Sequence, residues 1–253
     1  MTGFDVAADA YDRFMGRYSR LLSPQLADLA GVAAGQRALD VGCGPGALTA
    51  ELVARLGADA VTAVDPSEPF VLAALERHPG VTVLQASAAM LPFDDGTFDA
   101  ALAQLVVHFM PDPVAGLAEM RRVTRPGGVV AACVWDFAAG MGPLGPFWQA
   151  ALDLDPTAEA EAHLPGTREG HLLELFELAG LLDVRPAVLE VALEHPTFDA
   201  WWEPFQLGVG PAGGYVASLP PSGRAALRDR CRAVLPEAPF TITARAWAAR
   251  GTA

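Results

Sequence analysis

The residues best suited to chemistry lie in a short glycine-rich stretch in the first fifth of the chain. The segment 38–47, ALDVGCGPGA, is an apolar run that ends in Gly42, Gly44 and Gly46 and leads into a helical pattern. This order predicts a strand, a tight loop and a helix. Glycine adopts backbone conformations closed to other residues and lets a ligand lie directly against the backbone. We therefore expect this part of the chain to hold a nucleoside-containing cofactor.

The groups around the loop indicate which nucleoside it holds. Gly42, Gly44 and Ala47 also fit the dinucleotide pattern G-x-G-x-x-G/A, so an NAD-dependent oxidoreductase is one alternative. Asp40, however, places a carboxylate at the strand end, where it would repel a diphosphate, and Pro45 lacks a backbone N–H for an anion. S-adenosylmethionine carries an ammonium and a sulfonium and no phosphate. The loop therefore favours S-adenosylmethionine as the cofactor.

A second acid follows at the distance expected for a nucleoside site. The segment 60–64 is typical of a buried strand and ends at Asp65, 21 positions after Gly44. A carboxylate at this place can accept hydrogen bonds from both ribose hydroxyls. Asp65 thus supports a nucleoside ligand without deciding between NAD and S-adenosylmethionine.

Residues 39–46, LDVGCGPG, resemble motif I of the class I S-adenosylmethionine-dependent methyltransferases. The resemblance runs from about Tyr11 to Asp136 and is closest to the small-molecule branch that includes ubiquinone and menaquinone C-methyltransferases. It implies in-line transfer of a methyl group to O, N or C of a small, largely apolar metabolite. A protein that binds S-adenosylmethionine without transferring its methyl group remains an alternative.

The periodicity of the chain predicts an α/β fold. Helices are expected over 9–30 (with a break at Pro24), 47–56, 68–78, 114–123, 167–179 and 222–235, and strands over 38–41, 60–64, 81–84, 100–103, 129–135, 184–193 and 240–249. This order indicates a Rossmann-like, doubly wound sheet, mostly parallel, with an antiparallel last strand and helical lid insertions. We expect one methyltransferase domain over 1–253, with an N-terminal helical cover (1–30), a cofactor-binding core (31–136) and substrate lid insertions (137–166 and 194–236).

The resemblance implies a set of cofactor-binding residues. An arginine in the leading helical segment can pair with the methionine carboxylate, and a tyrosine can face the sulfonium, although packing of an amphipathic helix explains these residues equally well. Where relatives have an acid for the adenine amino group, this chain has Ser87, so we expect looser adenine recognition, with a backbone N–H from Ala88. The predicted set is Tyr11, Arg17, Tyr18, Asp40, Gly42, Cys43, Gly44, Gly46, Asp65, Pro66, Ser87, Ala88 and Gln104.

The reaction centre is expected beyond the fourth strand, where strand order reverses in such sheets. His108 is the candidate base, because histidine titrates near neutral pH; simple packing is the alternative. Aromatic residues in the two lid insertions are predicted to contact the substrate, although core packing explains them equally well. They are Trp148, Trp201, Trp202 and Phe205.

Composition argues against several kinds of partner and site. The formal net charge of −13 argues against nucleic acid or an anionic membrane as a partner. The three cysteines, Cys43, Cys133 and Cys231, form no C-x-x-C pair, so neither a metal site nor a disulfide is expected. No uncharged apolar stretch approaches the ~18 residues of a membrane span. We expect a cytoplasmic enzyme with a small-molecule substrate; the oligomeric state is not indicated.

Overall fold

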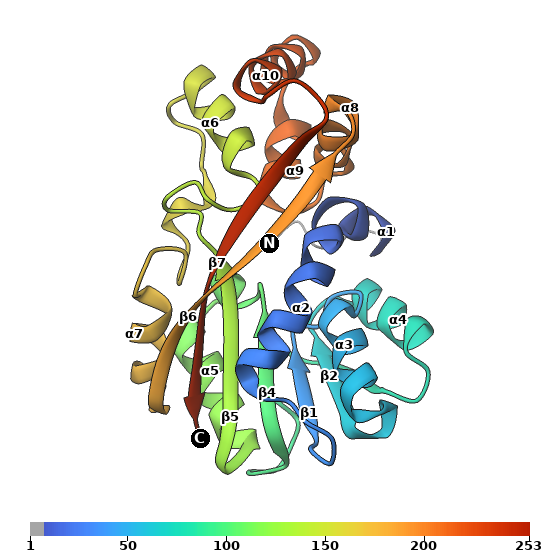
Figure 1. Cartoon of the computed structure of the whole chain (residues 1–253), viewed down its shortest axis with the longest axis vertical. Coiled ribbons are helices and arrows are strands. Elements are labelled where there is room, and N and C mark those ends of the chain that lie inside the picture. The colour runs from blue at the N-terminus through green and yellow to red at the C-terminus, as the bar shows by residue number, and fades with distance from the viewer. Residues whose placement is uncertain (1–7) are drawn as a thin grey trace.

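The computed structural model describes residues 8–253, and a seven-stranded sheet forms its centre (Figure 1). The spatial order of the strands is β3-β2-β1-β4-β5-β7-β6. The strands are β1 (Ala38–Val41), β2 (Val61–Asp65), β3 (Thr82–Gln85), β4 (Phe98–Gln104), β5 (Thr124–Trp135), β6 (Leu182–His195) and β7 (Phe240–Thr252). Neighbours among β1 to β5 are parallel, whereas β7 is antiparallel to both β5 and β6. The predicted Rossmann-like sheet with an antiparallel last strand is confirmed.

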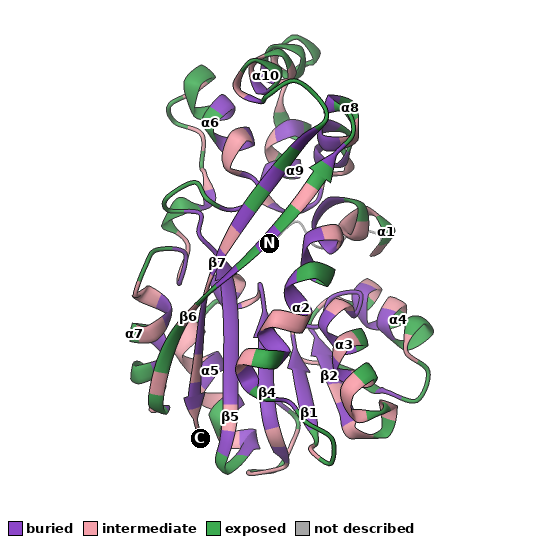
Figure 2. Ribbon diagram, in the orientation of Figure 1, coloured by how far each residue is buried: buried purple, intermediate pink, exposed green. Residues whose placement is uncertain are grey.

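Helices cover both faces of the sheet, which explains why most residues of its central strands are apolar. All four residues of β1 are buried, and Figure 2 shows the central strands buried almost throughout. One core cluster joins the sheet to α2 (Arg17–Ala30), α3 (Ala47–Leu56) and α4 (Glu68–Arg77). A second cluster joins the opposite face to α5 (Pro113–Val123) and α7 (His171–Leu178).

The leading helical segment differs from the prediction at its break. Pro24 lies inside α2, and the irregular turn comes earlier, as a π-helical turn at Asp12–Gly16 between α1 (Ala8–Tyr11) and α2. A proline inside a helix removes one backbone hydrogen bond. Buried Leu22 and Leu26 pack on either side of it, and this tertiary packing keeps α2 continuous. The part of the predicted N-terminal cover at residues 1–7 lies outside the described residues.

Four further helices gather beyond the carboxyl ends of the parallel strands, at the top of Figure 1, where β6 and β7 extend up to them. They are α6 (Gly145–Leu154), α8 (Phe198–Trp202), α9 (Gly210–Ser218) and α10 (Pro221–Val234), and we call them the cap together with the 3-10 turn Glu203–Leu207. Aromatic rings join its two segments: Phe147 stacks on Phe205 with 4.5 Å between ring centroids, and Trp148 lies 5.9 Å from Tyr215. The two predicted helical insertions therefore form one unit, although the positions of α6 and α9 within them were not predicted.

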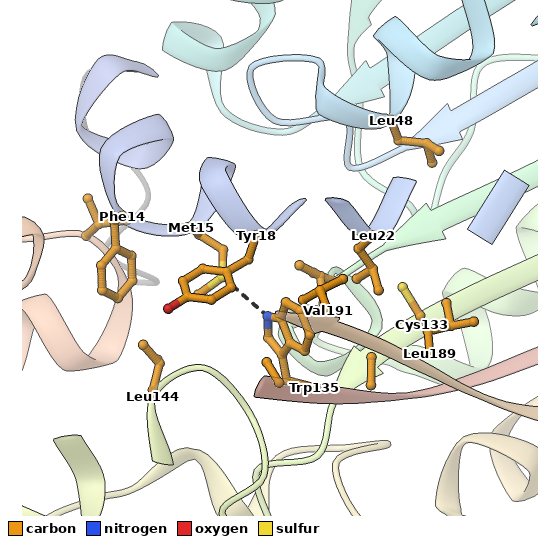
Figure 3. Packing of buried hydrophobic residues seen from close by; sticks show 14 of the residues in the cluster. Phe14, Met15, Tyr18, Leu22, Leu48, Cys133, Trp135, Leu144, Leu189 and Val191 are labelled. Atoms are coloured by element: carbon orange, nitrogen blue, oxygen red, sulfur yellow. Dashed lines mark hydrogen bonds between the residues drawn. The ribbon is translucent and has the colours of Figure 1, made fainter. Parts of the chain in front are cut away.

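Around the junction of cap and sheet, side chains of the π-helical turn and of α2 pack against the end of β5. Figure 3 shows Tyr18 and Met15 beside Trp135, whose indole N–H lies 3.3 Å from the sulfur of Met15. Leu144, which precedes α6, belongs to the same cluster. Among residues 8–253, no helix has the length and apolar character required to cross a membrane.

Candidate cofactor and acceptor site

A cavity of about 600 Å³ lies at the carboxyl ends of the central strands. Its walls come from the π-helical turn, the loops after β1, β2, β3 and β4, the end of β5 and the start of α9. Strands β1 and β4 are neighbours although the chain visits β2 and β3 between them. Ligands of open α/β sheets bind at such a reversal of strand order, so this cavity is the candidate functional site.

Each of the three loop positions requires glycine for a different structural reason. All have positive φ, at 73° for Gly42, 53° for Gly44 and 97° for Gly46. A Cβ atom would collide with Val106 at Gly42 and with His78 at Gly46, whereas at Gly44 it would meet nothing within 4 Å. Gly44 is buried and lines the cavity, so its missing side chain keeps the cavity open. Gly46, by contrast, does not line the cavity and serves packing.

Backbone N–H groups of the loop are already used within the protein. They donate from Gly42 and Cys43 to the carbonyl oxygen of Val64 (2.8 and 3.0 Å), from Gly44 to Asp65 Oδ2 (2.8 Å) and from Gly46 to the carbonyl oxygen of Cys43 (3.0 Å). Proline, the remaining loop residue, has no N–H. A diphosphate would need such donors, so the loop is unsuited to a dinucleotide.

Asp65 lies at the end of β2 and lines the cavity. Its Oδ2 accepts from the N–H of Gly44 and its Oδ1 from the N–H of Ser67, both at 2.8 Å. Burial raises the pKa of Asp65 above its usual value, while these two hydrogen bonds act in the opposite direction. Each carboxylate oxygen has more than one acceptor site, so Asp65 can also accept from the hydroxyls of a ribose.

Asp40 is the most buried carboxylate of the cavity, with 1% of its surface exposed. The hydroxyl of Thr49 donates to its Oδ2 at 2.6 Å, but its Oδ1 has no partner among the described residues. Burial, reinforced by the nearby charge of Asp65, raises the pKa of Asp40 to about 7. A buried polar atom without a partner requires an explanation, and a cationic donor in the cavity supplies one.

Two further cavity residues carry unpartnered buried atoms. They are Oε1 of Gln104 and Nδ1 of His108, as far as the described chain shows. The amide nitrogen of Gln104 is used, since it donates to the backbone oxygen of Ser19 at 3.1 Å. Asp40 and Gln104 thus offer two acceptor atoms to a ligand that donates hydrogen bonds.

Among its described lining residues, the cavity carries charged side chains of one kind only, and these are acidic. Five carboxylates line it, and none of its described lining residues is an arginine or a lysine. These acids are Asp40, Asp65, Glu68, Asp112 and Glu161. Together with the unpartnered acceptors and the open space at Gly44, the charge fits a ligand that contains a ribose, an ammonium and a sulfonium.

Most of the predicted cofactor residues line this cavity, and three do not. Those at the cavity are Tyr11, Asp40, Gly42, Cys43, Gly44, Asp65, Pro66, Ser87, Ala88 and Gln104. Arg17 instead donates to the backbone oxygens of Ala200 and Phe14, and Tyr18 is hydrogen-bonded to Nε2 of His195 at 2.9 Å. Arg17 and Tyr18 therefore tie α2 to the cap side of the fold rather than border the cavity.

None of the four aromatic residues predicted to contact substrate lines the cavity. Trp201, Trp202 and Phe205 are buried against one another in the cap, with ring centroids 4.8 to 6.4 Å apart. Trp148 is also buried, and its indole N–H donates to Oε2 of Glu161 at 2.9 Å. All four aromatic residues are thus packed within the cap, as expected from the alternative of core packing.

His108 lines the cavity and is buried between aromatic rings. Its ring centroid lies 4.0 Å from that of Phe109 and 5.8 Å from that of Phe137. Burial lowers the pKa of His108 to about 3, so the imidazole is neutral at pH 7. The catalytic role of His108 stays a prediction, and a base with this pKa holds a proton poorly at neutral pH.

Several cavity residues escaped the sequence reasoning. The lining also includes Phe14, Met15, Ser19, Trp135, Phe137, Leu144 and Glu161. Phe14, Met15 and Trp135 sit in segments that look like ordinary core, whereas Phe137 and Leu144 lie in the predicted lid insertion 137–166, where other aromatic residues were chosen. Glu161 lies in the irregular stretch before α7, where no pattern separates it from its exposed neighbour Glu159.

Comparison with known proteins identifies the family. The model of the methyltransferase domain family matches residues 39–132. A malonyl-[acyl-carrier protein] O-methyltransferase of Erwinia billingiae is 33% identical over 195 residues, which cover 73% of this chain and 74% of that protein. This chain belongs to the class I S-adenosylmethionine-dependent methyltransferases. The methyltransferase resemblance is confirmed, and S-adenosylmethionine, not NAD, is the cofactor of the family.

Other relatives share mainly the methyltransferase core. A demethylmenaquinone methyltransferase of Beutenbergia cavernae is 38% identical over 129 residues, covering 49% of this chain and 53% of that protein.

A solved complex between the Haloferax volcanii Trm112 methyltransferase activator and a methyltransferase contains a similar fold, with a TM-score of 0.65 and 20% identity. That match covers 100% of this chain and 98% of the solved chain. The methyltransferase fold thus extends over the whole described chain.

Proposed function

We propose that this methyltransferase acts on a small, largely apolar acceptor that carries no negative charge. The observation that carries the proposal is the charge of the cavity, which has five carboxylates and no arginine or lysine among its described lining residues. A carboxylate or phosphate on the acceptor would find no cationic side chain among these residues and would be repelled by the carboxylates. Phe14, Trp135, Phe137 and Leu144 give the same cavity an apolar surface.

The names of the relatives describe two kinds of acceptor. The Erwinia relative is named for malonyl groups, which end in a carboxylate, and the Beutenbergia relative for demethylmenaquinone. An apolar acceptor of the second kind agrees better with the cavity of this chain. Since the match covers only 53% of the Beutenbergia protein, the acceptor is proposed from the cavity and not from that name.

We infer that the cofactor lies along the glycine loop, with its ribose at Asp65 and its ammonium toward Asp40 and Gln104. The two hydrogen bonds that fix Asp65 and the unpartnered Oδ1 of Asp40 and Oε1 of Gln104 support this placement. When bound, S-adenosylmethionine supplies the activated methyl group, and the protein supplies alignment and exclusion of water. In this placement, the adenine lies against Pro66, Ser87 and Ala88, which also line the cavity.

The cap is proposed to be the substrate lid that the sequence suggested. Gly210, Pro211 and Ala212 at the start of α9 border the cavity, and Phe14 of the leading segment packs against Phe205 of the cap at 5.3 Å. These contacts support closure of the cavity from the cap side. We further infer from the negative net charge that the enzyme acts without nucleic acid. The three free cysteines favour a reducing compartment, so we infer that it acts in the cytoplasm.

Calorimetry and methyl transfer together test this function. S-adenosylhomocysteine and S-adenosylmethionine are expected to bind, and NAD is expected not to bind. In the presence of apolar acceptors, labelled S-adenosylmethionine is expected to lose its methyl group to the acceptor, whereas matched carboxylated acceptors are expected to remain unmethylated. Binding without transfer to any acceptor would favour a cofactor-binding protein with another activity, and preference for the carboxylated compounds would overturn the proposed acceptor.

A further inference from the structure

Glu161 is a buried acid at the cap side of the cavity, and nothing in the cofactor site accounts for it. Only 3% of its surface is exposed, and it borders the cavity together with Leu144 and the start of α9. Its Oε2 accepts from the indole N–H of Trp148 at 2.9 Å. Burying a carboxylate away from water is costly unless it is paired, and one neutral hydrogen bond is a small compensation.

The other four carboxylates of the cavity have different surroundings. Asp40 lies in β1 just before the glycine loop, and Asp65 lies at the end of β2, where the cofactor is proposed to bind. Glu68 and Asp112 are exposed, and Asp112 caps α5 by accepting from the N–H of Ala115 at 2.9 Å. Glu161 is thus the one buried carboxylate among the described lining residues that comes from outside the cofactor-binding core.

Resting on the proposed function, we propose that Glu161 is the general base of this methyltransferase and that its acceptor is an uncharged hydroxyl compound. The acceptor O–H donates to the Glu161 carboxylate within the apolar part of the cavity. As the new bond forms between the acceptor oxygen and the methyl carbon, the sulfur–methyl bond breaks and its electron pair stays on sulfur. The hydroxyl proton passes to Glu161, so the positive charge lost from sulfur matches the negative charge lost from the carboxylate.

Protonation behaviour agrees with this role. Burial raises the pKa of Glu161 to about 7, while the hydrogen bond from Trp148 acts to lower it. General bases work best when their pKa lies near the operating pH. His108, the base that the sequence analysis predicted, has its pKa lowered to about 3 by burial and holds a proton less well.

A hydroxyl suits this place better than an amine. An amine of ordinary basicity arrives protonated at neutral pH, and it must lose that proton before its lone pair can react. In the cavity the ammonium would also lie near a second cation, the sulfonium. A hydroxyl remains neutral until reaction, and its proton is the one that a nearby base must take.

Binding of 1-naphthol and of naphthalene to the protein loaded with S-adenosylhomocysteine tests the proposal by calorimetry at pH 8. The wild type is expected to bind 1-naphthol at least about tenfold more tightly than naphthalene, because a hydrogen bond to a buried carboxylate adds to the shared apolar contact. Glu161→Gln keeps an acceptor for Trp148 but is neutral, and it is expected to lose most of this preference. Glu159→Gln, at an exposed neighbouring position, is the matched control and is expected to keep it.

Turnover supplies the second readout. With 1-naphthol as the acceptor and labelled S-adenosylmethionine as the donor, the label is expected on oxygen, and Glu161→Gln is expected to lower kcat by about 100-fold or more. Trp148→Phe removes the hydrogen bond that lowers the pKa of Glu161, so it should move the acidic limb of the kcat/KM profile to higher pH. Trp148 is therefore a positioning residue, and a purely structural role would leave the limb in place.

An error in the inference about Glu161 and an error in the proposed function would give different experimental results. If the wild type binds no S-adenosylhomocysteine, the proposed function itself is wrong. If that ligand binds but 1-naphthol shows no preference over naphthalene, or Glu161→Gln keeps the wild-type preference, only the inference about Glu161 is overturned. Transfer of the label to a ring carbon of 1-naphthol instead of its oxygen would overturn the hydroxyl acceptor.

Discussion

The carboxylate of Asp65 accepts a hydrogen bond from the backbone N–H of Gly44, with 2.8 Å between N and Oδ2. One residue thereby joins the end of β2 to the glycine loop after β1, across 21 positions of sequence. Its other oxygen accepts from Ser67. The acid expected to hold the ribose therefore also fixes the shape of the loop against which the cofactor is proposed to lie.

Replacing Asp65 should reduce the free energy of cofactor binding by more than it reduces the free energy of unfolding. In Asp65→Asn, only one side-chain oxygen remains as an acceptor, so either Gly44 or Ser67 faces an N–H donor instead. Loss of a hydrogen bond to a charged group costs about 1.5–3 kcal/mol, and we expect the affinity for S-adenosylhomocysteine to fall by about 30-fold or more in calorimetry. Asp59→Asn, an exposed aspartate, is the control. Unchanged affinity in Asp65→Asn would contradict the proposed ribose contact.

Alanine at two glycines of the same loop should separate folding from binding. Gly42→Ala places its Cβ against Val106 at a positive φ, so we expect the free energy of unfolding to fall by about 2 kcal/mol or more. Gly44→Ala carries only the cost of the positive φ, about 1 kcal/mol, since nothing lies within 4 Å of its Cβ. That Cβ would enter the cavity, and we expect cofactor affinity to fall at least tenfold.

Urea unfolding and calorimetry of both variants check this expectation. The informative comparison is within each protein: stability loss should dominate in Gly42→Ala and affinity loss in Gly44→Ala. If Gly44→Ala binds S-adenosylhomocysteine as tightly as the wild type does, the cofactor does not pass over Gly44.

The sheet and its site could be predicted from sequence because their signals are local. Continuous apolar runs mark the parallel strands, and the glycine loop and Asp65 follow two of them at the expected spacing. The predicted helix 47–56 coincides with α3, and 68–78 differs from α4 by one residue at its end. Parallel strands align their carboxyl ends, so residues after β1, β2 and β4 were expected at one cavity, and most of them line it.

Long-range contacts account for the features that were not predicted. Arg17 and Tyr18 face the backbone oxygen of Ala200 and the ring of His195, partners that lie more than 170 positions away and that no local pattern reveals. The cap helices α6 and α9 begin among glycines and prolines, which obscure helical periodicity. Glu161 became recognisable only through its burial and its contact with Trp148.

The contact between Tyr18 and His195 should make the fold sensitive to acid. Burial lowers the pKa of His195 to about 4, with the charge of Arg17 adding to the effect. The unfolded chain, with a histidine pKa near 6.5, binds more protons between pH 6.5 and 4. The contribution of His195 to stability is therefore present above pH 6.5 and is lost as the pH falls toward 4.

His195→Gln retains a hydrogen-bonding partner for Tyr18 and does not titrate. Between pH 6.5 and 4, its free energy of unfolding in urea should fall less steeply than that of the wild type. His163→Gln, at an exposed histidine, should follow the wild type. Parallel curves for His195→Gln and the wild type would show that the protonation of His195 is not linked to unfolding.

Asp40 should couple cofactor binding to pH and oppose stability where it is ionised. Its pKa of about 7 in the folded chain exceeds the 3.8 of an unperturbed aspartate, because burial disfavours the charged form. The folded state then holds more protons than the unfolded state between these two values, so the contribution of Asp40 to stability is complete below pH 3.8 and is lost as the pH rises through 7. Asp40→Asn, which keeps an acceptor for Thr49, should be more stable than the wild type at pH 8, by about 2 kcal/mol.

Folding favours the protonated form of Asp40, whereas binding of the cationic cofactor should favour its ionised form. An ammonium near the unpartnered Oδ1 favours the ionised carboxylate, so affinity for S-adenosylmethionine should rise between pH 6 and 8, and binding at pH 6 should release close to one proton per site. Calorimetry in two buffers with different ionisation enthalpies measures this release. Asp40→Asn should bind at least tenfold more weakly at pH 8 and release no proton from this site. A wild-type affinity that does not change over this pH range, together with Asp40→Asn binding as tightly as the wild type, would mean that the ammonium of the cofactor lies elsewhere.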